Sequence, residues 1–370
     1  MKKVLYVATV LSHICQFHLP YLKMFKEKGY EVCVAARDNL AEKNGLQLKY
    51  ADKYFEIPFQ RSPFSVKNIS AYKQLKKIVN KEQYDLIVCN TPVGGILTRL
   101  AAKKVRKKGT KVVYIAHGFH FYQGASKKNW LIYYPIEKHF AKKCDTLITI
   151  TDEDYALASK KFQTKVVRMH GVGVDGERHH IIPIAEKFVL RKELNVGKDD
   201  FICLCTGELN ENKNQKSLIQ MVSEWHEKIP GFQLWLAGNG PLKEELETEA
   251  KRLGVKDYVK LLGYQPQIEK YIRASDVVIS ASKREGLPFN IIEAMLTKRP
   301  VVASINRGHK ELIIDGENGF MTNDPAVFIE DVVKLYQDKA LYEEIAEKAF
   351  EFAQSYTIQS TMKEFEDVWN

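Results

Sequence analysis

Residues 276–303 read DVVISASKREGLPFNIIEAMLTKRPVVA, and this stretch decides the fold. Two short apolar runs, Asp276–Ser280 and Pro300–Ala303, flank a segment with the apolar period of a helix that begins near Asn290. A strand, a helix and a second strand in this order form one βαβ unit of a parallel sheet, with the helix packed on a face of the sheet.

The same alternation of strand and helix patterns continues along the chain in both directions. Longer amphipathic segments such as Asn68–Asn80 separate the apolar runs. Further strands are predicted at Val4–Val10, Glu31–Ala36, Leu86–Cys89, Lys111–Ala116, Thr146–Ile150, Lys165–Met169, Phe201–Cys205, Phe232–Ala237 and Val259–Leu262. Two successive blocks of this kind predict two doubly wound α/β domains, which also fits 370 residues at roughly 100–200 residues per domain.

The domain boundary is predicted where the periodicity stops. His170 to Ile184 contains three glycines, a proline and a histidine pair without an apolar pattern. We therefore expect a first domain over residues 1–170, a linker over 171–186, a second domain over 187–354 and a final helix over 355–370.

Composition and charge exclude several classes of protein. With 45% hydrophobic and 28% charged residues the chain is an ordinary globular one, neither disordered nor collagen-like. No apolar run approaches the roughly 18 residues of a membrane span. Ser12 and His13 interrupt the first run, and no cleavage site follows, so we expect a strand there and not a signal peptide. The six cysteines form no CxxC pair, which predicts a reducing, cytoplasmic compartment.

The positive charge is concentrated in the first half of the chain. Residues 1–180 carry 32 lysines and arginines against 15 acids, while the second half carries 24 against 31. Two segments stand out, 103–111 with six cations and 127–143 with cations mixed among aromatics. An anionic membrane surface is the expected partner. A solvated basic face is the alternative, and nucleic acid is not expected because no binding motif accompanies the charge.

The residues that follow the strands are candidates for a ligand site, because ligands of open α/β sheets bind at the carboxyl ends of the strands. Glu285 is predicted on the loop after Asp276–Ser280, and Glu293 in the first turn of the next helix. Two carboxylates beside helix amides suit a ligand with hydroxyls and phosphates. A structural alternative is a capping box from Asn290 to Glu293 with a solvated Glu285.

Two weaker motifs are interpreted structurally. Asp152-Glu153-Asp154 imitates a DxD metal site, but Thr151 before it predicts an N-cap with acids in the first helical turn. Gly238-Asn239-Gly240-Pro241 is too short for a dinucleotide fingerprint. We therefore expect no metal and no cofactor.

The second half of the chain resembles retaining glycosyltransferases of family 4. The resemblance rests on Glu285 and Glu293 with seven residues between them inside Glu-Gly-Leu-Pro-Phe, on Leu261–Tyr264 and on Pro300–Ala303. The first half is similar to glycosyltransferases of capsule and exopolysaccharide assembly in Phe17–Pro20, Arg61–Phe64 and Ala116–Tyr122. The resemblance implies a GT-B fold, in which two Rossmann-like domains face a central cleft. It also implies a donor on the second domain, an acceptor on the first and a final helix that crosses back to the first.

The resemblance assigns roles to particular residues. The donor-binding set is Gly207, Lys213, Tyr264, Glu285, Gly286, Leu287, Pro288, Phe289, Asn290 and Glu293. The catalytic set is His117, Lys213 and Glu285, and the acceptor-binding set is Ser12, His13, His18, Arg61 and His120. Within the donor set, Glu285 would bind hydroxyls of the sugar, Glu293 the ribose and Lys213 the diphosphate. Without the resemblance, Lys213 would be interpreted as a solvated lysine in a polar turn. His117 would be interpreted as a buried histidine of the core.

The sequence departs from the family pattern in three places. Glu208 follows Gly207 where an arginine is common, the loop Ser12–Cys15 lacks a glycine pair, and Asn90 stands where relatives often have histidine. Lys283 and Arg284 are available to replace the missing arginine.

The implied activity is a metal-independent, retaining transfer of a hexosyl or N-acetylhexosaminyl group from a UDP-sugar. The nucleotide sugar is a substrate, and the expected acceptor is a polyprenyl-diphosphate-linked saccharide at the inner face of the bacterial cytoplasmic membrane. The alternatives are a UDP-sugar epimerase of the same fold and, because of Glu208, a nucleotide-sugar-binding protein without catalysis.

Overall fold

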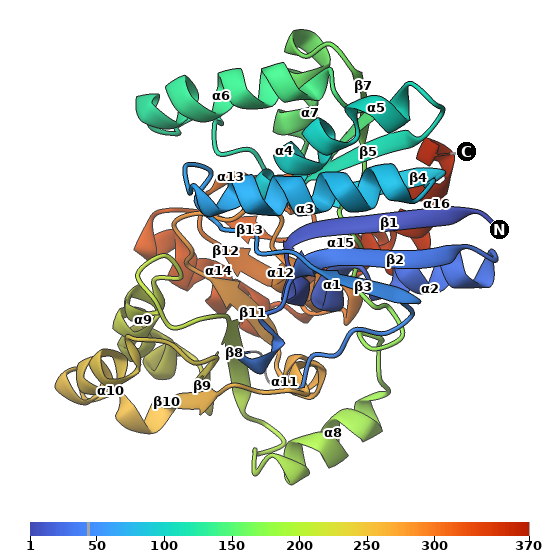
Figure 1. Cartoon of the computed structure of the whole chain (residues 1–370). Coiled ribbons are helices and arrows are strands. Elements are labelled where there is room, and N and C mark those ends of the chain that lie inside the picture. The colour runs from blue at the N-terminus through green and yellow to red at the C-terminus, as the bar shows by residue number, and fades with distance from the viewer. Residues whose placement is uncertain (43–44, 370) are drawn as a thin grey trace. The chain divides into compact units, whose positions relative to one another are not determined.

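A computed structural model describes residues 1–42 and 45–369 (Figure 1). The chain forms two compact units, Met1–Gly173 together with the final segment from Ile358, and Val174–Thr357. Each unit is a parallel sheet with helices on both faces, as the alternating pattern predicts.

The first unit contains a seven-stranded sheet with the order β3-β2-β1-β4-β5-β6-β7, in which every pair of neighbours is parallel. The order changes direction between β1 and β4, so the carboxyl ends of these two strands form the edge where an open sheet binds its ligand. The strands are β1 (Lys3–Val10), β2 (Glu31–Arg37), β3 (Lys53–Glu56), β4 (Leu86–Asn90), β5 (Lys111–Ala116), β6 (Thr146–Thr149) and β7 (Lys165–Arg168).

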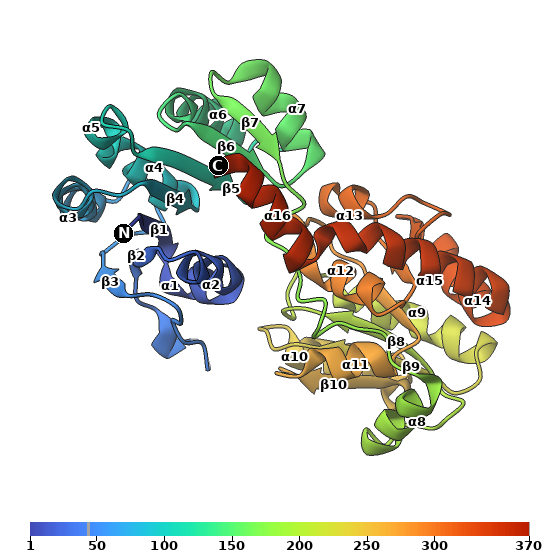
Figure 2. The same ribbon diagram turned by 90° about the vertical axis from the view of Figure 1, so that its right-hand side faces the viewer.

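Helices cover both faces of this sheet. In Figures 1 and 2, α3, α4 and α5 lie on one face, and α1, α2 and α16 lie on the other. The helices of the unit are α1 (Leu11–Phe17), α2 (Leu19–Glu27), the 3-10 turn η1 (Leu40–Glu42), α3 (Lys67–Lys81), α4 (Pro92–Ala101), α5 (Lys103–Arg106), α6 (Lys127–Ala141), α7 (Asp152–Lys161) and α16 (Ile358–Trp369).

The last helix, α16, packs against α2 of the first unit. The ring of Trp369 lies 5.1 Å from that of Phe25, and the Tyr21 hydroxyl donates to Thr361 Oγ1 at 3.1 Å. Burial of these aromatic side chains, each worth about 1.5–3 kcal/mol, holds the end of the chain on this unit.

The second unit contains a six-stranded parallel sheet with the order β10-β9-β8-β11-β12-β13. Its strands are β8 (Phe201–Thr206), β9 (Phe232–Ala237), β10 (Val259–Gly263), β11 (Val277–Ser280), β12 (Val301–Ala303) and β13 (Phe320–Met321). Its helices are α8 (Ile184–Glu193), α9 (Gln215–Lys228), α10 (Lys243–Arg252), η2 (Lys256–Tyr258), α11 (Ile268–Ala274), α12 (Phe289–Leu296), α13 (Arg307–Leu312), α14 (Pro325–Gln337), α15 (Lys339–Ala353) and η3 (Gln354–Tyr356).

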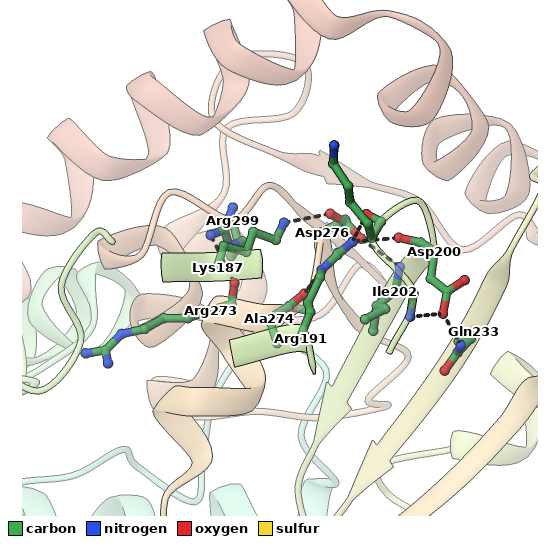
Figure 3. Close-up of polar contacts among 12 residues, drawn as sticks. Lys187, Arg191, Asp200, Ile202, Gln233, Arg273, Ala274, Asp276 and Arg299 are labelled. Atoms are coloured by element: carbon green, nitrogen blue, oxygen red, sulfur yellow. Dashed lines mark hydrogen bonds and ion pairs between the residues drawn. The ribbon is translucent and has the colours of Figure 1, made fainter. Parts of the chain in front are cut away.

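A buried ion cluster fixes α8 to the amino-terminal edge of this sheet (Figure 3). Asp276, directly before β11, binds Lys187 Nζ at 2.7 Å and Arg191 Nη2 at 2.5 Å, and it accepts from the Ile202 amide at 2.8 Å. Arg191 also donates to the carbonyl of Ala274. Removing one partner would leave a buried charge without compensation, so the cluster stabilises the unit only when complete.

The starts of helices α7 and α12 test three local predictions. The Thr151 side chain accepts from the Asp154 amide and caps α7, so the N-cap prediction is confirmed. The capping box is wrong, because α12 begins at Phe289 after Pro288 and no side chain caps it. Glu293 is the fifth residue of α12, so it lies just past the first turn in which it was predicted.

Candidate active site

The candidate site of the second unit is built around an ion pair between two loops. Lys213 Nζ lies 2.7 Å from Glu285 Oε1, and both side chains are largely buried, with 20% and 14% of their surface exposed. Lys213 lies after β8 and Glu285 after β11, and these two strands are neighbours in the sheet. The structure therefore brings together the lysine and carboxylate that the sequence motif assigned to one site.

Glycines let the backbone approach this ion pair closely. Gly207 has φ +140°, and a Cβ atom there would lie 2.9 Å from Cε of Lys213. Gly238 has φ +152°, and a Cβ atom there would overlap the carbonyl oxygen of Gly207. Residues other than glycine rarely adopt these angles, so both positions require glycine.

Glu293 lies in a different environment from Glu285. Burial raises the pKa of Glu293 to about 7, and Arg178 and Glu269 act on it more weakly and in opposite directions. His179 Nε2 lies 3.7 Å from Glu293 Oε1, but burial lowers the pKa of His179 to about 4. The histidine is therefore neutral near pH 7, and this contact is not an ion pair.

A cavity of about 490 Å³ lies beside Glu293. Three predicted donor-binding residues line it, namely Gly207, Tyr264 and Glu293, together with Glu208 and Arg178. Lys213, Glu285 and residues 286–290 do not line this cavity. Within that loop Gly286 is exposed, Leu287 and Pro288 are buried, Phe289 is half-buried in the first turn of α12, and Asn290 donates to the Thr206 carbonyl at 3.4 Å.

Arg178 is a candidate residue that the sequence did not identify. Its guanidinium binds Glu269 at 2.8 Å and the Pro266 carbonyl at 2.7 Å at the wall of the cavity. It belongs to the segment interpreted as a linker, and nothing in the local pattern separates it from a solvated arginine. Lys283 and Arg284, which the sequence offers in place of the missing arginine, do not line this cavity, and Lys283 pairs with Glu211 at 3.5 Å.

The first unit contains a second cavity, of about 350 Å³, at the carboxyl ends of β1, β4 and β5. Three of the five predicted acceptor-binding residues line it, namely His13, Arg61 and His120, and the His120 ring stacks on Tyr133 at 4.6 Å. Ser12 does not line it, because its hydroxyl accepts from Asn39 Nδ2 at 2.9 Å. His18 does not line it either, since it is fully buried.

The three histidines His13, His18 and His117 form one cluster at this edge of the sheet. Nε2 of His13 and Nε2 of His117 are 3.3 Å apart, and the His18 ring centroid lies 5.2 and 5.6 Å from the other two. His117 Nε2 also lies 3.1 Å from Asn90 Oδ1. Burial lowers the pKa of His13 to about 4 and those of His18 and His117 well below the ordinary value.

Thr91 marks the same edge by an unusual backbone conformation. It has φ +63° and ψ 151°, and its Oγ1 accepts from the Thr9 amide at 2.9 Å. A β-branched residue in this region is strained by about 1–3 kcal/mol, and such strain clusters at binding sites. Thr91 lines the cavity and was not predicted, because its neighbours Asn90 and Pro92 resemble an ordinary loop.

Comparison with known proteins agrees with this architecture. Residues 186–352 match the family described as "Glycosyl transferases group 1", and residues 3–151 match "Glycosyl transferase 4-like". A "Putative glycosyltransferase EpsD" of Bacillus subtilis is 42% identical over 374 residues, which span 100% of this chain and 96% of the relative. The chain therefore belongs to the group 1 and family 4-like glycosyltransferases.

A second relative and two solved structures are less similar in sequence. The "UDP-Gal:alpha-D-GlcNAc-diphosphoundecaprenol alpha-1,3-galactosyltransferase" of Escherichia coli is 30% identical over 75% of each chain. A crystal structure of Anabaena HepE in complex with UDP has a TM-score of 0.78 at 21% identity and covers 100% of this chain and 99% of that one. WaaG, a glycosyltransferase involved in lipopolysaccharide biosynthesis, has a TM-score of 0.72 at 16% identity, with 99% of both chains covered.

These comparisons confirm the predicted family, the GT-B fold class with two Rossmann-like sheets, and the enzyme class of glycosyltransferase. Among the residues that the structure describes, no helix is long and apolar enough to cross a membrane.

Proposed function

We propose that this glycosyltransferase moves a hexosyl or N-acetylhexosaminyl group, with retention, from a UDP-sugar to a hydroxyl of a polyprenyl-diphosphate-linked saccharide. The reaction would serve bacterial surface polysaccharide synthesis. The Lys213–Glu285 pair beside Gly207 carries the proposal, because it offers a cation and a carboxylate where a glycine brings the backbone against the lysine. The Escherichia coli relative supports it, since its name contains both a UDP-sugar and a diphosphoundecaprenol-linked acceptor.

The donor would separate the two charges of the ion pair. The Lys213 ammonium would turn to the diphosphate, and Glu285 would accept hydrogen bonds from the sugar hydroxyls. During transfer the bond from the anomeric carbon to the phosphate oxygen breaks, and the acceptor oxygen forms its bond to the same carbon. The acceptor proton passes to the departing phosphate oxygen. Negative charge grows on the diphosphate, so a fixed cation stabilises the transition state more than the bound substrate.

The cavity beside Glu293 would hold the nucleoside. A carboxylate suits the two ribose hydroxyls, and Tyr264, 61% exposed at the rim, offers an aromatic face. Arg178, on the wall of this cavity, would supply a second cation. It would compensate for Glu208, which stands where an arginine is common in the family. We expect neither a metal ion nor a cofactor at the diphosphate, where Lys213 and the backbone amides of Gly286, Leu287, Phe289 and Asn290 would suffice.

The cavity of the first unit would hold the acceptor saccharide. His13, Arg61 and His120 present ring nitrogens and a guanidinium to it, while Tyr114 and Tyr133 supply aromatic walls. Ser12, His18 and His117 do not line this cavity. Ser12 and His18 would hold neighbouring residues in position, and His117 would act near the reacting carbon through His13, whose Nε2 lies 3.3 Å from that of His117.

A lipid-linked acceptor requires an enzyme that docks at a membrane, and α3 offers the surface. Its exposed face carries five lysines and no acid, namely Lys67, Lys73, Lys76, Lys77 and Lys81. The preceding loop exposes Phe64 and Val66, at 74% and 78%, directly after the cavity residues Arg61 and Pro63. Exposed apolar residues beside a lysine row are typical of peripheral docking, at about 1 kcal/mol per lysine.

The aromatic residues that the sequence offered for membrane contact are only partly exposed. Trp130, Tyr133 and Tyr134 of α6 pack against the hydrophobic core of the first unit. The proposal therefore uses α3 with its preceding loop in place of these aromatic residues.

The transfer is tested by incubating the full chain with labelled UDP-sugars, with and without a synthetic polyprenyl-diphosphate disaccharide. The expected product is an extended lipid whose new linkage keeps the anomeric configuration of the donor. An isomerised UDP-sugar formed without acceptor would instead show an epimerase. Binding of UDP-sugars without any turnover across donors would favour the non-catalytic alternative.

Membrane docking is tested by flotation with vesicles of anionic lipid. A variant with the five α3 lysines changed to glutamine should lose salt-sensitive flotation. A matched variant with five exposed lysines of the second unit changed, at 228, 243, 251, 256 and 339, should keep it. Equal flotation of both variants would contradict the assignment to α3.

A further inference from the structure

The histidine cluster of the first unit occupies the position where an open sheet binds ligands. His13 lies on α1 directly after β1, His117 follows β5, and His18 lies between α1 and α2. β1, β4 and β5 are consecutive in the sheet order, and the order changes direction between β1 and β4. Three imidazoles from separate segments therefore meet at the topological switch point.

The spacing of the ring nitrogens matches that of metal ligands. Each histidine offers one nitrogen, and these three atoms lie within 4.8 Å of one another. Nitrogens bound to a tetrahedral zinc ion at about 2.0–2.1 Å lie about 3.3 Å apart. The Nε2 atoms of His13 and His117 are already at 3.3 Å.

Hydrogen bonds inside the protein do not account for the cluster. His13 and His117 can share one proton, and His117 can pair with Asn90. His18 is fully buried, yet neither of its ring nitrogens has a hydrogen-bond partner among the described residues. Asn90 Nδ2 and the Tyr6 hydroxyl nearby are buried without a partner in the same described part of the chain. Buried polar atoms without partners are costly and rare, so four of them in one place indicate a missing ligand.

We propose that His13, His18 and His117 bind one divalent metal ion of the zinc class. Neutral imidazole is the commonest zinc ligand, and the group contains three of them with no carboxylate or thiol among the described residues. The expectation of no metal, drawn from the sequence, considered acids and cysteines and did not bring these three histidines together.

The coordination would be open on the side of the cavity. Three protein ligands leave a fourth position for an oxygen ligand, and three neutral imidazoles leave the ion with its full charge of two. His13 lines the cavity while His18 and His117 lie behind it, so an oxygen of a phosphate or sugar hydroxyl in the cavity could occupy that position. The ion would thus position a ligand in the first unit, and it is separate from the role proposed for Lys213.

Metal binding is tested on the full chain without a histidine tag. The protein is stripped with a chelator, equilibrated with Zn²⁺ and measured by inductively coupled plasma mass spectrometry. One zinc ion per chain is expected, with the visible absorption of a tetrahedral site when Co²⁺ replaces it. Zn²⁺ should also raise the melting temperature in a concentration-dependent way, because it binds only the folded state.

Variants connect the ion to these histidines. His13→Gln and His117→Gln should each weaken Zn²⁺ binding more than about 100-fold, since loss of a ligand exceeds the 10–100-fold cost of losing an outer-shell partner. His120→Gln, three residues from His117 and on the same cavity, and His226→Gln in the second unit should retain stoichiometric zinc. His18→Ala removes a buried ring, so circular dichroism must first show that it folds.

Less than one tightly bound zinc ion per chain would overturn the proposal. Equal losses in His13→Gln and His226→Gln would also overturn it, because binding would then be adventitious. Metal content is measured without substrates, so failure here leaves the proposed transfer untouched, and failure of transfer leaves the metal result intact.

Discussion

The two units share an architecture but use their buried arginines, Arg99 and Arg191, in different ways. In the first unit Arg99 Nη2 binds Glu137 Oε2 at 3.0 Å, and Glu137 itself lines the cavity at the carboxyl edge. In the second unit the Asp276 cluster lies at the amino edge, away from Lys213 and Glu285. The carboxylate paired with Arg99 therefore lines a cavity, whereas the carboxylate paired with Arg191 supports only the scaffold.

The two sites also differ in how they recognise a ligand. The second unit uses formal charges, Lys213 and Glu285, and glycines that bring the backbone close. The first unit presents histidine rings together with Arg61 and Glu137, and the backbone of Thr91 is strained there. A lysine beside a glycine loop suits a phosphorylated donor, whereas a mixed set of hydrogen-bond donors and acceptors suits sugar hydroxyls. The same fold can thus carry two chemically distinct sites.

The largest effect is expected from breaking the buried pairs. Asp276→Asn should destabilise the protein by about 3–5 kcal/mol, because Lys187 and Arg191 would be left buried without a full counter-charge. Glu137→Gln should cost a similar amount through Arg99. Urea unfolding measured by circular dichroism provides both values.

Ligand binding by the folded fraction of each variant separates a scaffold role from a role in a site. Asp276→Asn should bind UDP as the wild type does, since the cluster lies at the opposite edge from the donor residues. Glu137→Gln should raise the KM for the acceptor. A loss of UDP affinity in Asp276→Asn would show that the two edges of the second unit are coupled.

The next largest effect concerns the charged site. Lys213→Ala should lower the rate of transfer about 10²–10³-fold, the usual cost of losing one group that stabilises developing charge. The rate constant kcat should fall more than UDP-sugar affinity, because the diphosphate gains charge only as the bond breaks. Steady-state kinetics at saturating donor measures this.

Lys283→Ala is the matched control for Lys213→Ala. Lys283 lies two residues from Glu285 in the same loop, but its side chain is 59% exposed and pairs with Glu211. Its removal should change the rate less than about threefold, as expected for a surface pair worth 0–1 kcal/mol. Similar losses of transfer rate in the two variants would show that the rate depends on the conformation of the loop and not on the charge of Lys213.

Much of the fold could be predicted from the sequence, because central parallel strands are buried on both faces. β1, β4, β8 and β11 appear as short runs of apolar residues that no other element explains. The edge strands β3 and β13 were missed. β3 has charged ends and is half-exposed, and β13 is only two residues long, so neither has an apolar run.

The candidate site could be predicted only where local sequence holds its chemistry. Glu285, Gly286 and Glu293 lie in one motif, and the structure places the predicted Lys213 against the first of them. Arg178, Thr91 and the lysine row of α3 depend on tertiary packing, which no short pattern encodes. His18 shows what a motif cannot encode, since this residue assigned to the acceptor is fully buried and does not line the cavity.

The smallest expected effect is the pH dependence contributed by Glu293. Its pKa of about 7 in the folded protein lies above the ordinary 4.5, so the folded state holds the proton more tightly than the unfolded chain. The resulting stability is complete below pH 4.5 and is lost as the pH rises through 7. Glu293→Gln mimics the protonated form, so it should be more stable than the wild type at pH 8 and nearly equal to it at pH 4.5.

The difference at pH 8 should be about 1–2 kcal/mol, less than the full shift would give, because 21% of the side chain is exposed to water. His179, Arg178 and Glu269 face the same carboxyl and are unchanged in the variant. Glu351→Gln, an exposed carboxylate on α15, controls for charge removal. An equal pH dependence of the stability of wild type and Glu293→Gln between pH 4.5 and 8 would mean that folding does not raise the pKa of Glu293. Glu293 would then take part in the donor site as a carboxylate at neutral pH.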